Sequence, residues 1–126
     1  KKLLSEREHD VELWNEAGML AWSIEDWRGL EQCGQRVSAL APDLSSGWSM
    51  LAASHRAAGR YQEAEASLLQ AVACEDAEAV CWVMLARLRE RNGDLDGAMN
   101  AWKSATDIDD SLSEHPRLVD GAGSGG

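Results

Sequence analysis

Three histidines, three cysteines and a group of aspartates are the side chains of this sequence that could support catalysis or bind a metal ion. His9, His55 and His115 lie far apart in the chain, and none has the spacing of a known catalytic or metal-binding motif. His55 falls on the apolar face of an expected helix, where a hydrogen-bonded core histidine is more common than a ligand. The histidines therefore indicate no active site.

The cysteines give no stronger signal. Cys33, Cys74 and Cys81 form neither a CxxC pair nor a cluster with histidine. An odd and scattered set indicates buried thiols in a reducing compartment rather than a disulfide framework or a metal site. Because Cys74 and Cys81 flank one expected turn, a bridge between them stays open for an oxidising compartment.

An acidic cluster lies near the end of the last expected helix. Asp107, Asp109 and Asp110 supply carboxylates of the kind that calcium prefers, but the glycine and glutamate of a calcium-binding loop are missing. A solvated surface is the better interpretation. The sequence thus predicts no catalytic residue, metal ion or cofactor, and the chain is expected not to be an enzyme.

Length and charge narrow the classes of function that remain for this chain. The chain has 126 residues and a formal net charge of -10, which disfavours binding to nucleic acid or to anionic membranes. No apolar run approaches the roughly 20 residues that span a bilayer, so no membrane insertion is expected. The N-terminus lacks the apolar stretch of a signal peptide, which favours a cytoplasmic location. A periplasmic or other location stays open if Lys1 is not the natural start.

Three tryptophans repeat with one period. Trp14, Trp48 and Trp82 are spaced by 34 residues, and the segments that begin at Trp48 and Trp82 each read as two amphipathic helices joined at a glycine. The period divides the chain into units at residues 11–44, 45–78 and 79–112. Residues 1–10 are then an N-terminal extension or the end of a preceding helix. Residues 113–126 are expected to form a short capping turn and a flexible Gly-rich tail.

Local signals set the expected ends of the helices. Asp10 is the expected N-cap of the first helix, and Ser45 or Ser46 that of the third. The second helix is expected from Trp27 to about Leu40, before Pro42. Gly59 is expected to take a left-handed conformation at a helix end.

Two predictions concern packing. Trp48 and Trp82 are expected to be buried where neighbouring helices meet. The face of Ala98, Trp102 and Ala105, which would meet a further repeat, is expected to have no cover.

These patterns resemble the tetratricopeptide repeat. Unit two matches the family's spaced signature at Trp48, Leu51, Ala52, Gly59, Tyr61, Ala64 and Ala71. Unit three matches it at Trp82, Leu85, Ala86, Gly93, Ala98 and Ala105, with Leu95 in place of the tyrosine. Unit one keeps Trp14, Gly18 and Pro42 of the signature. It departs from the signature at three positions, with Glu25 for the turn glycine, Leu30 for the first alanine and Gly34 for a large residue. Trp27 is expected to fill the space that Gly34 leaves. The resemblance implies an all-α fold, a right-handed α-solenoid of three helix-turn-helix units.

The resemblance also implies a concave groove lined by the first helix of each unit. The peptide-groove residues carried over in this way are Glu12, Asn15, Glu16, Met19, Trp22, Ser49, Met50, Ala53, Arg56, Val83, Met84, Arg87 and Arg91. The family's carboxylate clamp would need polar groups at Asn15, Met19, Met50, Val80 and Met84, and only Asn15 fits. The expected groove instead has a methionine-rich floor that faces solvent, beside Trp22, with arginines on its wall. The alternative is that some of these side chains pack between helices.

The resulting functional prediction is a non-catalytic module for protein–protein interaction. Its partner would be another protein or a peptide segment, bound as a peptide or helix in the concave groove. Two alternatives stay open. One is a structural scaffold that self-associates through its uncapped terminal face, giving a homo-oligomer through the last helix pair. The other is a regulatory domain of a larger enzyme or assembly protein.

Overall fold

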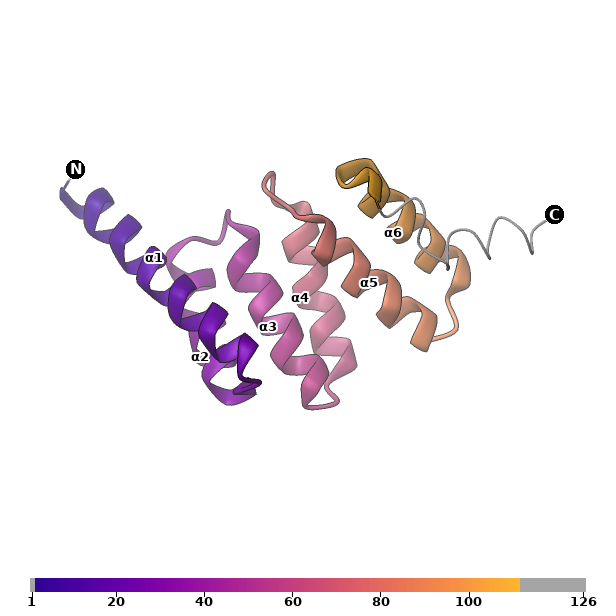
Figure 1. Ribbon diagram of the computed structural model, residues 1–126, viewed down its shortest axis with the longest axis horizontal. Helices are drawn as coiled ribbons and strands as arrows, with labels where there is room; N and C mark the ends of the chain where they lie inside the picture. The colour runs from indigo at the N-terminus through magenta and orange to yellow at the C-terminus, as the bar shows by residue number, and fades with distance from the viewer. Residues whose placement is uncertain (1, 112–126) are drawn as a thin grey trace. The chain divides into compact units, whose positions relative to one another are not determined.

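The computed structural model describes residues 2–111 of the chain, with the side chains of residues 8–111. Within this range the chain forms six α-helices and no β-strand (Figure 1). They are α1 (Lys2–Ser23), α2 (Trp27–Leu40), α3 (Ser45–Ala57), α4 (Tyr61–Ala73), α5 (Ala79–Arg91) and α6 (Leu95–Ile108). The all-α prediction and its helix-turn-helix pairs are confirmed. The expected capping turn and tail at residues 113–126 lie outside the described residues.

The chain divides into two compact units. The first, Lys1–Ala77, holds α1 to α4, and the second, Glu78–Gly126, holds α5 and α6. In the first unit each helix packs against the next one along the chain, and α1 also contacts α3. In the second unit α5 packs against α6. The division follows Ala77, beside the boundary that the sequence period places between residues 78 and 79.

The turn inside each helix pair requires a left-handed residue. Gly59 has a φ of +80° and Gly93 a φ of +82°, and Glu25 takes a φ of +60° at the same place in the first pair. The predicted conformation of Gly59 is confirmed. Glu25 carries a Cβ atom in a conformation that costs roughly 1–2 kcal/mol for a residue other than glycine. The first turn is therefore strained where the other two are not.

Replacing Glu25 with glycine should stabilise the protein by about 0.5–1 kcal/mol, because relief of the strain exceeds the extra chain entropy that glycine loses. Urea denaturation measures the free energy of unfolding. Gly59→Ala is the matched reverse change, because a Cβ atom there would meet nothing within 4 Å and only the φ angle counts. It should lose a similar amount. No gain for Glu25→Gly over Glu25→Ala would show that the turn is unstrained.

Aspartates that the sequence analysis did not identify as caps bind the first N–H groups of several helices. Asp26 and Asp94 cap α2 and α6 by accepting a hydrogen bond from the backbone N–H three residues later. The third helix is capped differently from the prediction, because the Ser45 N–H donates to Asp76 Oδ1 at 2.9 Å. Neither Ser45 nor Ser46 is the N-cap, which is Leu44. The predicted cap at Asp10 is also wrong, since α1 is continuous from Lys2.

A close approach of backbones joins α2 to α3. An added Cβ atom on Gly47 would lie 2.5 Å from the Ser38 backbone nitrogen, and one on Gly34 would lie 3.0 Å from the Gly47 carbonyl oxygen. The α3 backbone and Leu51 therefore occupy the space that Gly34 leaves open. The expectation that Trp27 fills this space is wrong, and Trp27 is itself only half-buried.

The tryptophans differ from prediction in burial. Trp48 and Trp82, expected in the core, are only half-buried, and the Trp48 Nε1–H donates to the Pro42 carbonyl at 2.9 Å. Trp102 is 1% exposed, and its Nε1–H donates to Glu90 Oε2 of α5 at 3.3 Å. Ala98 and Ala105 are buried with it. The prediction of an uncovered face on α6 is therefore wrong.

Candidate functional site

Helix α1 presents three faces because its residues follow the helical period of 3.6. The first is buried and includes Val11, Gly18 and Ala21, with the Trp14 ring beside it under the Arg36 guanidinium, 5.6 Å from the ring centroid. The second, the outer face, exposes the large apolar side chains Leu13 and Leu20, and Ile24, in the turn just after the helix, extends this apolar surface. The third carries Glu8, Glu12, Asn15, Glu16 and Met19.

The third face of α1 and the loop between α2 and α3 enclose an open cavity of about 570 Å³. It is lined by Glu8, Val11, Glu12, Asn15, Glu16, Met19, Ala41, Asp43 and Leu44. Val11 and Ala41 form its buried apolar floor, and Met19, which is 63% exposed, stands at its rim. We call this the α1 cavity. It lies wholly within the first compact unit.

Asn15 has an unusual position in the α1 cavity. Its side-chain oxygen Oδ1 is buried yet accepts no hydrogen bond from any part of the chain that the structure describes. Leaving a buried acceptor without a donor costs about 1–3 kcal/mol, so such atoms are rare in folded proteins. Asn15 therefore carries an unsatisfied acceptor beside the cavity, and this oxygen is itself closed to solvent.

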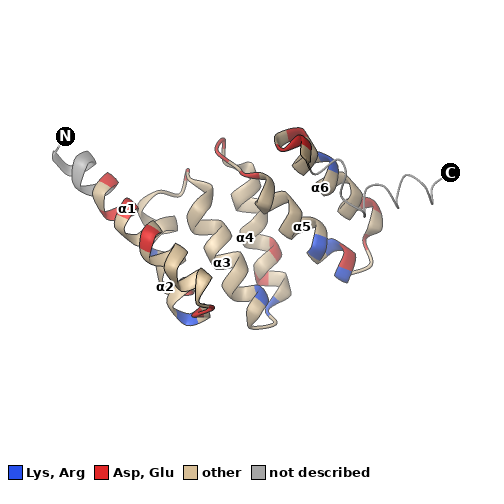
Figure 2. Cartoon of the chain, viewed as in Figure 1, with Lys and Arg blue, Asp and Glu red and all other residues tan. Residues whose placement is uncertain are grey.

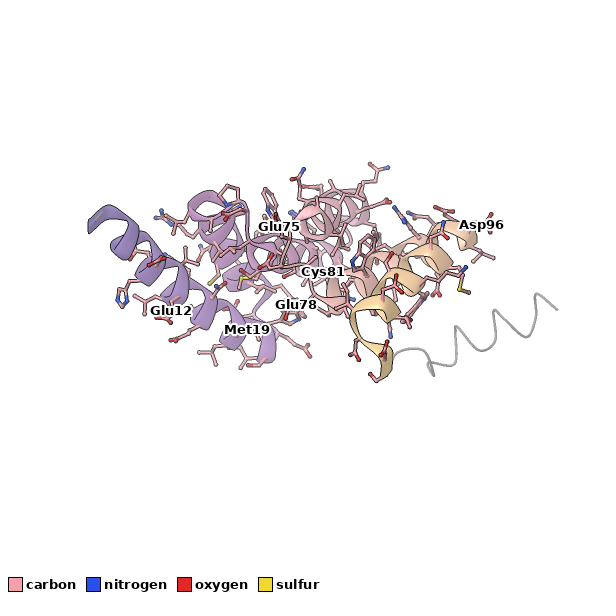
Figure 3. The ribbon with its side chains drawn as sticks, turned by 90° about the horizontal axis from the view of Figure 1, so that it is seen from above. Glu12, Met19, Glu75, Glu78, Cys81 and Asp96 are labelled. Carbon is pink, nitrogen blue, oxygen red and sulfur yellow. The ribbon has the colours of Figure 1, made fainter. Side chains whose placement is uncertain are left out.

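The charge around the α1 cavity is entirely acidic among the described side chains that line it. Glu8, Glu12, Glu16 and Asp43 carry carboxylates, and the lining side chains within residues 8–111 include no lysine or arginine. Figure 2 shows that acidic residues recur along α1, and Figure 3 shows Glu12 and Met19 along one edge of the helix. The described side chains therefore give the cavity a negative potential.

The three cysteines, all within the described residues, are not joined in disulfide bonds and do not line this cavity. Burial raises the pKa of Cys33, and the Asp26 carboxylate adds to the shift. Burial also raises the pKa of Cys74, with further contributions from Asp76 and Asp43. Since the thiolate is the reactive form of cysteine, a raised pKa makes both groups poor nucleophiles at neutral pH.

No family model and no curated protein sequence matches the chain. Solved structures do match. A mutant O-GlcNAc transferase from Thermobaculum terrenum superimposes with a TM-score of 0.74 at 22% identity, over 82% of this chain. The Arabidopsis OM64 TPR domain gives 0.75 at 15% identity, over 83% of this chain and 87% of its own. The TPR2B domain of yeast Sti1, solved in a pHsp70 complex, has a TM-score of 0.74 at 18% identity. The match covers 87% of this chain and 90% of the Sti1 domain.

The chain has the tetratricopeptide-repeat fold. It spans only 20% of the length of the Thermobaculum protein, so that protein's activity is not transferred to it. No helix in the described residues is both long and apolar enough to cross a membrane.

The tetratricopeptide-repeat groove residues named from the sequence fall into three groups by exposure. Those exposed are Glu12, Glu16, Met19, Arg87 and Arg91. Those half-buried are Asn15, Trp22, Arg56 and Val83. Those buried are Ser49, Met50, Ala53 and Met84. The expectation that Met50 and Met84 face solvent as an accessible floor is wrong, because they are only 2% and 5% exposed.

The burial of Met50 has a clear cause in the first unit. A Cβ atom added to Gly18 would lie 2.6 Å from Met50 Sδ and 3.3 Å from Cys33 Cβ. The missing side chain of Gly18 thus lets Met50 of α3 enter the space between α1 and α2. Met50 is a core residue here. Of the three expected floor methionines, only Met19 is free to contact a ligand.

Five lining residues of the α1 cavity were absent from the predicted set. They are Glu8, Val11, Ala41, Asp43 and Leu44. Three of them belong to the loop between α2 and α3, which the family's groove positions do not include. The expected helix end before Pro42 located this loop in the sequence but did not place it beside α1.

Proposed function

We propose that the chain is a non-catalytic protein-interaction module that binds a peptide or helical segment of another protein at the α1 cavity. The observation that carries this proposal is the combination of a buried apolar floor, an exposed methionine and an unpaired amide oxygen in one opening. Binding sites are typically concave and mainly apolar, with a few polar groups that fix orientation. The α1 cavity is concave and has an apolar floor, and five of its nine described lining residues are polar or charged.

The size and composition of the cavity support a segment rather than a large flat interface. A volume of about 570 Å³ lies within the range of ligand sites, roughly 300–1,000 Å³. Met19 is flexible and polarisable, and such side chains adapt to differently shaped apolar partners. The fold is shared with the yeast Sti1 domain, which was solved in a pHsp70 complex. That likeness supports a protein partner for this chain.

Two adjacent residues of α1 provide the test. Met19 and Leu20 are 63% and 62% exposed, but Met19 lines the α1 cavity and Leu20 lies on the outer face. Peptides selected from a display library on the wild-type chain should lose affinity for Met19→Glu by about tenfold or more, because a charge replaces the apolar contact. Leu20→Glu should bind them as wild type does. Thermal melts check that both variants remain folded.

The opposite pattern would contradict the proposal. If Leu20→Glu abolishes peptide binding and Met19→Glu does not, the site is the outer face of α1. A second candidate function, self-association, rests on that same apolar face of Leu13, Leu20 and Ile24. Light scattering tests self-association. If the wild type and Met19→Glu form an oligomer and Leu20→Glu does not, self-association is favoured over peptide binding.

A further inference from the structure

We infer that the α1 cavity selects a basic partner segment, with a lysine or arginine inserted beside an apolar residue. This inference rests on the proposed function and specifies the chemistry of its partner. It is carried by the glutamate carboxylates of the cavity, by the unpaired oxygen of Asn15 and by the apolar floor.

The carboxylates are arranged at a cost that a cation would relieve. Glu8, Glu12 and Glu16 are spaced by four residues on one face of α1, where like charges repel each other across each helical turn. Asp43, which already has an interaction within the protein, contributes a further carboxylate from the loop, so the three glutamates carry the argument. Placing an ammonium or guanidinium group among them replaces this repulsion with attraction. A ligand carboxylate there would increase the repulsion, which disfavours acidic peptides.

Asn15 has no donor for its Oδ1 atom among the described residues, and a ligand donor reaches this oxygen when the amide turns toward the cavity. Its buried Oδ1 lies on the same face of α1 as Glu12 and Glu16, and ionised carboxylates can only accept hydrogen bonds. Lysine offers three N–H donors and arginine five, so either can satisfy Asn15 and still bind a carboxylate. A ligand of apolar residues alone would leave this oxygen unpaired.

The apolar floor matches the rest of a basic side chain. Lysine and arginine bury their methylene stems on apolar surface while the charged head contacts polar groups. Val11 and Ala41 are 8% and 1% exposed and can contact such a stem. Met19 at the rim can contact a neighbouring apolar residue of the segment. The site therefore fits a cationic and amphipathic sequence.

The experiment uses the full chain and three short fluorescein-labelled peptides with leucines on one face. They differ at one central position, which is arginine, norleucine or glutamate. Fluorescence anisotropy should give the tightest binding for arginine, about tenfold weaker binding for norleucine and the weakest for glutamate. Raising the salt concentration should reduce the advantage of arginine, because salt screens charge attraction.

Matched variants test the named groups. Glu12→Gln with Glu16→Gln should weaken binding of the arginine peptide about tenfold. Asp107→Asn with Asp110→Asn changes the net charge equally at exposed positions of the other unit and should leave binding unchanged. Asn15→Leu should weaken binding of the arginine peptide and leave that of the norleucine peptide unchanged. It should not lower the melting temperature, since it removes an unpaired buried group.

Two failures are distinguishable. If arginine and norleucine peptides bind equally well and both lose affinity for Met19→Glu, the cavity binds protein segments without a charge preference, and this inference is overturned. The inference is also overturned if Glu12→Gln with Glu16→Gln and Asp107→Asn with Asp110→Asn weaken binding equally. The peptide would then be attracted by the net charge of the protein and not by the α1 cavity. If neither these peptides nor a display library yields a binder, the proposed function itself fails.

Discussion

Trp102→Ala is expected to destabilise the protein by about 3–5 kcal/mol, a larger loss than for any other single substitution proposed for this chain. The ring is 1% exposed in the α5–α6 pair, so its removal leaves a large cavity between two short helices. The change also leaves Glu90 Oε2 without the indole N–H that lies 3.3 Å away. Because small domains have only about 5–15 kcal/mol of stability, this unit should be largely unfolded near body temperature.

Denaturation followed by far-ultraviolet circular dichroism measures the effect. Lys103→Ala is the control, since Lys103 is the exposed neighbour of Trp102 on the same helix and should change stability by less than about 0.5 kcal/mol. Trp48→Ala should lose less than Trp102→Ala because the Trp48 ring is only half-buried. Equal losses for Trp48→Ala and Trp102→Ala would contradict the observed difference in burial.

Gly47→Ala is the second substitution with a large expected effect on stability. Whether it stabilises or destabilises the protein is the informative result. In an ordinary helix this change stabilises by about 0.8–1.0 kcal/mol, because alanine is the better helix former. Here the new Cβ atom would lie 2.5 Å from the Ser38 nitrogen and 3.0 Å from its Cα. Both atoms belong to the backbone of α2 and cannot rotate away. Forcing α2 and α3 apart should cost about 1–3 kcal/mol or more.

The matched control for Gly47 is the residue before it. Ser46→Ala makes the same new side chain one position earlier in α3, where the residue is half-buried. It should be neutral or slightly stabilising. Urea denaturation of both variants gives the comparison. A gain in stability for Gly47→Ala would show that α2 and α3 do not approach each other closely at this point.

Much of the fold was predictable because the signals are local or strictly periodic. The expected second helix from Trp27 to Leu40 is found with those bounds, and Gly59 is left-handed as predicted. The caps were harder, since the N–H of Ser45 is bound by Asp76, which lies 31 residues later. A cap supplied by a distant loop has no local sequence signal.

The candidate site was predicted less well for a physical reason. Family positions place residues on the groove only if the helices keep their usual separation. Here Gly18 lets Met50 pack between helices, so a predicted floor residue becomes part of the core. Glu12, Asn15 and Met19, which the family resemblance assigned to the groove, share one face of α1 and line the α1 cavity, and their role in binding stays a prediction.

The most direct test of the interaction site is a titration of the full chain with the arginine peptide, followed by amide chemical shifts in NMR spectra. The largest shifts are predicted at the residues that line the α1 cavity, which are Glu8, Val11, Glu12, Asn15, Glu16 and Met19 of α1 and Ala41, Asp43 and Leu44 of the loop. The amides of α4 and α6 should change little. Shifts centred on α4, on α6 or on the outer face around Leu13 and Ile24 would contradict the assignment of the site.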